Sequence, residues 1–278
     1  MKLATLRTGD STVAVRIDTD SAIEIDGFTD VGALLANGDW RAVAETAAGT
    51  AHPLTGIPDT DWAPVVPAPS KIVCVGLNYR NHILEMGREL PEFPTLFAKY
   101  PEALIGPYDE IALPEYASHA VDWEAELAVV IGTTARRLSP EQAADAIAGY
   151  SVLNDVTMRD YQYRTPEWFQ GKTFEATTPF GPYLVTPDAY GVDTDIRTEV
   201  GDEVLQHSNT SDLVFDPATL VSYISQIVTL NPGDVIASGT PGGVGHARKP
   251  PRYLGQGDVL STVIEGLGTL RNPVRVEG

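Results

Sequence analysis

Short apolar segments separated by turn residues dominate the chain from about residue 70 onward. Residues 71–75, 95–100, 111–113, 124–131, 150–155 and 234–238 have the length and composition of buried β-strands. Residues 140–147 and 217–230 have helical spacing, and each segment starts with proline after a capping residue. Residues 78–86 predict one or two further helical turns. The pattern therefore predicts an α+β, mainly β domain with a few covering helices.

A different pattern precedes this part of the chain. Residues 13–17 have the composition of a short strand, and residues 34–48 have interrupted helical spacing. The segment 63–69 contains three prolines, which lack a backbone donor and interrupt regular structure. We therefore expect a small N-terminal α/β domain over residues 1–66 and a main domain over residues 70–278.

The charge balance excludes some classes of partner. The 278 residues include 38 Asp and Glu against 19 Lys and Arg, which gives a formal net charge of −19. Nucleic acids and anionic membranes both attract basic surfaces, so we expect neither as a partner.

The single cysteine, Cys74, excludes an intramolecular disulfide and a cysteine-based zinc site. Neither a leader nor an apolar run of about 20 residues is visible, so a cytoplasmic protein is expected.

Three carboxylates stand at the ends of two apolar strands, where solubility does not require them. Glu124 and Glu126 are two residues apart, so in a strand they point to the same side. Asp155 ends the apolar strand that follows. Neighbouring carboxylates repel one another unless solvent or a cation lies between them. The three residues either mark solvated strand ends or bind a divalent cation such as Mg²⁺ or Mn²⁺, which prefers oxygen ligands.

His82 and Glu85 are three residues apart on a predicted helical turn, so their side chains can meet. A carboxylate that holds one imidazole nitrogen raises the basicity of the other, as the activation of water requires. Gly76 and Gly87 bracket the segment, as suits a mobile lid. An ordinary surface contact between His82 and Glu85 is the alternative.

A glycine-rich segment, residues 239–245, precedes the largest basic cluster, His246-Ala247-Arg248-Lys249. The segment lacks the Gly-Lys-Ser/Thr ending of a phosphate-binding loop. We expect instead a tight turn that brings the backbone close to a ligand or to another chain. His246 belongs to a polar loop, where a surface position and a substrate-facing position are both open.

Several short motifs occur together and in one order along the chain. They are Gly76-Leu77-Asn78-Tyr79 with His82 and Glu85, Ile105-Gly106-Pro107, Asp122-Trp123-Glu124-Ala125-Glu126, Asn154-Asp155-Val156-Thr157, Gly171-Lys172-Thr173, Asn209-Thr210-Ser211-Asp212 and Gly239-Thr240-Pro241-Gly242-Gly243. Because these motifs occur together in this order, the chain resembles the fumarylacetoacetate hydrolase family over about three quarters of its length. The resemblance implies a mixed β-roll of the family's C-terminal type with flanking helices, assembled as a homodimer.

The resemblance also implies roles for individual residues. The implied Mg²⁺ or Mn²⁺ ligands are Glu124, Glu126 and Asp155, the implied catalytic residues are His82, Glu85 and Lys172, and the implied substrate contacts are Arg159, Gln162 and Thr240. The residues alone leave alternatives open for two of these. Lys172 could be a solvated lysine in a polar turn, and Arg159 could form an ion pair with Asp155 or Asp160.

The reaction implied by the resemblance is hydrolysis of a C–C bond in a diketo acid of the acylpyruvate or fumarylpyruvate type, through a metal-bound enolate. Such acids arise in the degradation of aromatic compounds. Oxaloacetate decarboxylation and hydroxy-dienedioate isomerisation are alternatives at the same site. A non-catalytic dicarboxylate-binding protein is a further alternative, and turnover of a diketo or dicarboxylic acid would exclude it.

Overall fold

The computed structural model describes residues 1–85, 87 and 89–278, and for Glu85 it describes the backbone alone. The largest sheet is mixed and has eleven strands. Ten of them lie in the order β4 (Ala51–Pro53), β3 (Ser21–Glu24), β2 (Ser11–Ile17), β1 (Lys2–Thr8), β13 (Thr178–Val185), β11 (Ile147–Asn154), β10 (Ala125–Ile131), β16 (Val235–Ala237), β5 (Ile72–Gly76) and β6 (Thr95–Lys99). The remaining strand, β7 (Leu104–Ile105), pairs with β13.

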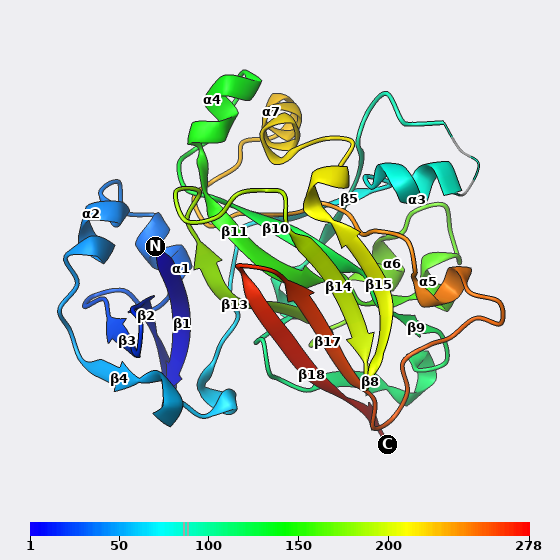
Figure 1. The fold of residues 1–278 in the computed structure, drawn as a ribbon, viewed down its shortest axis with the longest axis horizontal. Helices are drawn as coiled ribbons and strands as arrows, with labels where there is room; N and C mark the ends of the chain where they lie inside the picture. Colours follow the sequence, from blue (N-terminus) through cyan, green and yellow to red (C-terminus); the bar gives the residue numbers. More distant parts are fainter. Residues whose placement is uncertain (86, 88) are drawn as a thin grey trace.

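A second sheet has five strands. Its order is β15 (Glu203–Asn209), β14 (Asp195–Val200), β17 (Val259–Ile264), β18 (Gly268–Glu277) and β8 (Ile111–Pro114). A short ribbon joins β12 (Thr157–Met158) to β9 (Val121–Asp122). Side chains of β10 such as Leu127 pack with Ile196 and Ile264 of the second sheet in one buried core. Figure 1 shows the second sheet stacked against β10 and β11, so the predicted mainly β class is confirmed.

Short helices cover the edges of these sheets (Figure 1). They are α1 (Val31–Leu35), α2 (Trp40–Glu45), α3 (Arg80–Glu85), α4 (Pro140–Asp145), α5 (Arg159–Gln162), α6 (Phe169–Lys172) and α7 (Pro217–Ile227). The 3₁₀ turns are Leu54–Gly56, Asp59–Asp61, Pro101–Ala103, Glu115–Ala117, Thr210–Asp212 and Gly245–Ala247. Ser139 and Gln142 form the predicted capping box of α4. The predicted helix ends at residues 147 and 230 are wrong, because Ile147 begins β11 and Val228 has extended backbone.

The N-terminal strands continue the main sheet. Lys2 of β1 lies opposite Val185 of β13 in an antiparallel pair. Leu34 and Trp40, from α1 and α2, belong to the same buried cluster as Leu184 of β13. The predicted domain boundary between residues 66 and 70 stays a prediction.

Candidate active site and metal centre

Strand pairing brings the three predicted metal ligands together. Ala125 of β10 lies opposite Asn154 of β11, so Glu124 and Asp155 face each other just beyond the two strand ends. The backbone N–H of Asp155 donates to the Glu124 carbonyl oxygen at 2.8 Å. One carboxylate oxygen from each of Glu124, Glu126 and Asp155 lies within 4.8 Å of the others, and all three residues are buried. Solvated strand ends are therefore the wrong interpretation of this motif.

Two buried lysines donate hydrogen bonds to the carboxylates of this cluster. Lys172 Nζ donates to Glu124 Oε2 at 2.7 Å and to Asp155 Oδ2 at 2.8 Å. Lys99 Nζ donates to Asp155 Oδ1 at 2.6 Å. Burial acts to lower the pKa of Lys172, but the Asp155 and Glu124 carboxylates outweigh it, so the pKa lies above its usual value. Lys172 thus stays charged and is not a solvated lysine, since it is only 2% exposed.

Arg159 connects the cluster to a fourth buried carboxylate. Its Nε and Nη2 both lie 2.8 Å from Asp122 Oδ2, and Nη2 lies 2.7 Å from Glu124 Oε1. The alternative ion pairs with Asp155 and Asp160 are wrong. The pairing of β12 with β9 places the start of α5 beside Asp122, which sequence distance does not reveal.

Gln162 and Thr240 are both oriented as hydrogen-bond donors. Arg159 Nη1 can only donate, so the oxygen it contacts at 2.9 Å is Gln162 Oε1, which leaves the amide N–H₂ available. The backbone N–H of Ala125 donates to the Gln206 side chain at 3.0 Å, so the contacted atom is Gln206 Oε1. Gln206 Nε2 is therefore the atom that donates to Thr240 Oγ1 at 2.9 Å. The Thr240 hydroxyl hydrogen is therefore left for another acceptor. Both side chains suit the oxygens of an acidic substrate.

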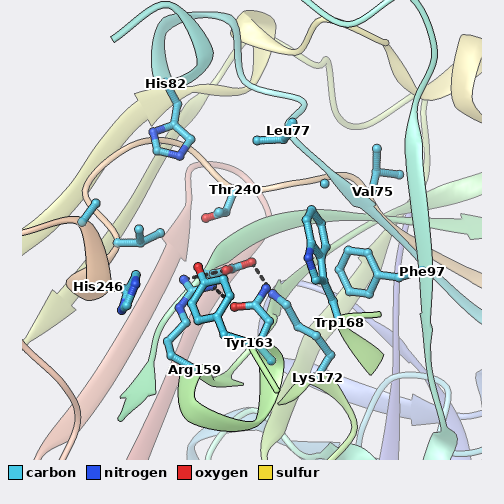
Figure 2. A pocket seen from close by; sticks show the side chains of 15 residues that line it. Val75, Leu77, His82, Phe97, Arg159, Tyr163, Trp168, Lys172, Thr240 and His246 are labelled. Carbon is cyan, nitrogen blue, oxygen red and sulfur yellow. Dashed lines mark hydrogen bonds and ion pairs between the residues drawn. The ribbon is translucent and has the colours of Figure 1, made fainter. Parts of the chain in front are cut away.

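A cavity of about 390 Å³ opens over this cluster. Six of the nine predicted site residues line it: His82, Glu124, Arg159, Gln162, Lys172 and Thr240. Figure 2 shows His82 across the cavity from Arg159 and Lys172. Glu126 and Asp155 adjoin Glu124 within the carboxylate cluster. The predicted partner of His82, Glu85, has its side chain outside the described part of the chain, so the dyad stays a prediction.

Hydrogen bonds fix the start of the helix that carries His82. The Asn78 amide donates to the carbonyl oxygens of Ser238 at 2.7 Å and Phe215 at 3.0 Å. Its Oδ1 accepts from the Phe215 N–H at 2.8 Å. Asp212 Oδ2 accepts from the Asn81 N–H at 2.9 Å, at the first turn of α3. These contacts attach the N-terminal end of α3 to residues 212–215 and to Ser238, which lies two residues before the cavity residue Thr240.

Gly171 allows α5 and α6 to approach closely enough to share the site. A Cβ added at Gly171 would lie 2.5 Å from both the Gln162 backbone nitrogen and the Met158 carbonyl oxygen. Both neighbours are backbone atoms, so Gly171→Ala must separate the two helices. We expect unfolding to become easier by about 1–3 kcal/mol, together with a higher KM. Thermal unfolding and substrate titration measure both effects.

Gly191→Ala is the matched control, because a Cβ there meets nothing within 4 Å and its φ is ordinary. Equal stability and KM in the Gly171→Ala and Gly191→Ala variants would contradict the packing role of Gly171.

Lys99 and Asp122 belong to the site although the sequence did not single out their roles. Lys99 ends the apolar strand β6 and is 2% exposed. A lysine that ends an apolar strand was the available signal, because a lysine that becomes buried there is normally paired. Asp122 is fully buried, holds Arg159, and accepts from the N–H groups of Trp123, Gly245 and His246.

The buried charged groups of the site favour binding of a divalent cation. Four buried carboxylates, from Asp122, Glu124, Glu126 and Asp155, face three buried cationic groups, from Lys99, Arg159 and Lys172. Among the described residues, Glu126 forms no ion pair and accepts only from the Gly239 N–H at 2.8 Å. Burial, then the Asp155 and Glu124 charges, raise the pKa of Glu126 well above its usual value. An oxygen-only donor set with excess negative charge suits Mg²⁺ or Mn²⁺.

Comparisons with known proteins identify the family of this chain. A family model described as fumarylacetoacetate (FAA) hydrolase C-terminal matches residues 71–275. The chain belongs to the fumarylacetoacetate hydrolase family. The family predicted from the motifs is therefore confirmed, and it is a family of enzymes that act on small molecules. Divalent-metal dependence is general in this family, and the buried acidic triad is present here.

Individual members of the fumarylacetoacetate hydrolase family resemble the chain over most of its length. The Xenopus laevis protein named "Oxaloacetate tautomerase fahd2, mitochondrial" is 45% identical over 210 residues, which cover 74% of this chain and 66% of that protein. The chain therefore spans about two thirds of the length of this relative.

Two solved structures cover 100% of this chain and 100% of their own chains. The fumarylacetoacetate hydrolase of Exiguobacterium antarcticum has a TM-score of 0.86 at 34% identity. The 5-carboxymethyl-2-hydroxymuconate delta-isomerase of Mycobacterium smegmatis has a TM-score of 0.84 at 35% identity. The family thus includes hydrolases, isomerases and tautomerases among these relatives. In the described part of this chain, none of the helices has the length and apolar character needed to cross a bilayer.

Proposed function

We propose that this protein is a divalent-metal-dependent tautomerase that moves a proton between the enol and keto forms of a 2-keto dicarboxylic acid of the oxaloacetate type. The observation that carries the proposal is that His82 faces Lys172 and Arg159 across one cavity. The 45% identity to an oxaloacetate tautomerase supports the choice among the reactions of the family.

The residues on the two sides of the cavity have different tasks. Arg159, Gln162 and Thr240 donate hydrogen bonds to the carboxylate and keto oxygens of the substrate. Lys172, held charged by Glu124 and Asp155, stabilises the negative oxygen that develops as the enol loses its O–H proton. His82 delivers a proton to C3 of the same molecule, since imidazole exchanges protons near neutral pH. The O–H proton passes to water, and His82 regains a proton from water after protonating C3. The net change therefore moves one proton from oxygen to carbon, and no other bond breaks.

Glu124, Glu126 and Asp155 would hold Mg²⁺ or Mn²⁺ beside this substrate. A bound divalent ion supplies Lewis acidity, which polarises the keto oxygen and lowers the energy of the enolate.

Hydrolysis of a C–C bond in an acylpyruvate or fumarylpyruvate is the second candidate. The full-length similarity to a fumarylacetoacetate hydrolase supports it. In that reaction His82 would remove a proton from water, which then attacks the carbonyl distal to the carboxylate. Oxaloacetate decarboxylation needs the same enolate stabilisation by Lys172 without an attacking water.

One panel assay separates these reactions. Purified protein is given the enol form of oxaloacetate, then acetylpyruvate and fumarylpyruvate, each with Mg²⁺ or Mn²⁺ and with an EDTA control. We expect the ultraviolet absorbance of enol oxaloacetate to fall without release of pyruvate. Pyruvate release from the acylpyruvates would favour hydrolysis, and release from oxaloacetate would favour decarboxylation. Turnover that resists EDTA would contradict the metal requirement, and no turnover at all would favour a binding protein.

The homodimer, the role in aromatic compound catabolism and the cytoplasmic location implied by the sequence stay predictions. Size-exclusion chromatography with light scattering tests the first. The relative from Xenopus laevis is named as mitochondrial, so location requires its own measurement.

A further inference from the structure

We propose that His246 and the loop that carries it, residues 243–253, bind a second carboxylate of the substrate at the end remote from the 2-keto acid group. This inference rests on the proposed function, and it makes His246 a specificity residue that selects dicarboxylic over monocarboxylic keto acids. We call residues 243–253 the distal-carboxylate loop.

One buried carboxylate fixes this loop relative to the reacting end of the cavity. Asp122 Oδ2 accepts from the His246 backbone N–H at 2.9 Å and from Arg159 Nε at 2.8 Å. Asp122 Oδ1 accepts from the Gly245 N–H at 2.7 Å. The same oxygen atom therefore positions the backbone of His246 and the guanidinium of Arg159. A substrate held by Arg159 has its far end within reach of the loop.

The imidazole of His246 is held in one place with one nitrogen available. Its Nδ1 lies 2.9 Å from the Tyr253 hydroxyl oxygen. The ring also packs against Tyr163, with 5.1 Å between the ring centroids. Within the part of the chain that the structure describes, Nε2 has no hydrogen-bond partner. Figure 2 shows the His246 ring beside Tyr163 and Arg159 at the cavity wall. When the Tyr253 hydroxyl donates to Nδ1, or when the ring is protonated, Nε2 carries a hydrogen that it can donate to a carboxylate oxygen.

The loop has a local charge opposite to that of the whole protein. The chain carries a net charge of −19, yet residues 239–257 contain no Asp or Glu and include Arg248, Lys249 and Arg252. Glu203 of β15 pairs with Arg252 and lies 3.8 Å from Arg248, and it offsets part of this charge. The remaining positive charge beside the cavity attracts a dianion more strongly than a monoanion.

The substrate class follows from the chemistry of these groups. A monocarboxylic acylpyruvate would place an uncharged group against the Nε2–H of His246 and would leave that donor without an acceptor. A second carboxylate forms a charge-assisted hydrogen bond there, which is stronger than a neutral one. The geometry therefore favours a 2-keto acid with a second carboxylate.

The test compares a diacid with its own monoester. Oxaloacetate and its 4-methyl ester differ in the charge at the remote end, while the 2-keto acid group is the same in both. With the Mg²⁺-loaded full chain, His246→Ala is expected to raise KM for oxaloacetate by about 10-fold to 100-fold. KM for the ester and kcat for both compounds are expected to change less than about 3-fold, because the reacting groups are intact. His246→Gln, which keeps an N–H donor, is expected to recover part of the loss.

His119→Ala is the matched control, because His119 is exposed and does not line the cavity. Calorimetric titration of both compounds measures binding without turnover, so it still tests the subsite if the proposed reaction is wrong. An equal change in KM and Kd for diacid and ester, or no change in either, would overturn the subsite. Failure of the wild-type protein to bind either compound would overturn both the subsite and the proposed function.

Discussion

Replacing Glu126 with Gln is expected to abolish binding of Mg²⁺ or Mn²⁺ while leaving the metal-free protein at least as stable as the wild type. Glu126 is the buried carboxylate of the cluster that has no ion pair in the described residues, and it accepts a hydrogen bond from the Gly239 N–H. A glutamine keeps that acceptor and removes an uncompensated buried charge, which is costly in a protein interior. The metal site, in contrast, loses one of its three carboxylates.

Thermal unfolding in EDTA and in excess Mg²⁺ measures the two effects separately. A ligand at 100 times its Kd stabilises the folded state by about 2.7 kcal/mol, and Glu126→Gln is expected to lose this increment. Enzymatic turnover should fall together with metal binding. Glu265→Gln, at an exposed position in the turn between β17 and β18, removes the same charge outside the cluster and should keep the increment. A Glu126→Gln variant that is still stabilised by Mg²⁺ would show that the three carboxylates do not form the metal site.

His82→Ala is expected to lower kcat by about 10²-fold to 10⁴-fold, the usual contribution of a general acid or base. Metal affinity should stay nearly unchanged, because His82 lines the opposite wall of the cavity from the carboxylate cluster. The rate constant and the metal-induced shift in Tm are the two measurements. Both the tautomerase and the hydrolase candidates require this loss, since each uses His82 to move a proton.

Asn81→Ala is the matched control, because Asn81 is exposed on the same turn of α3 and its backbone N–H, not its side chain, contacts Asp212. An equal loss of kcat in that variant would assign the effect to the helix and not to the imidazole. Loss of metal binding by His82→Ala would likewise contradict the proton-transfer role.

The sequence located strands more reliably where apolar residues are continuous. Strand β10, an unbroken buried run, was predicted from its composition. Strand β14 alternates buried and partly exposed residues over only six positions, and it was missed. Strand β13 was missed because it contains Pro179, Gly181 and Pro182, which normally argue against a strand in the middle of a sheet. Packing from both sides compensates for these weak local preferences, and a local pattern does not contain that information.

The residue motifs by themselves determined the family, the carboxylate triad and the segment that carries His82. These inferences need only chemical type and order along the chain. The tertiary structure alone decided which charges meet. Lys99 reaches Asp155 across 56 positions and Arg159 reaches Asp122 across 37. Such pairs depend on the order and register of strands, which result from the packing of the whole sheet and not from neighbouring residues. For the same physical reason, only the fold revealed that His246, in an otherwise ordinary polar loop, lies at the wall of the cavity.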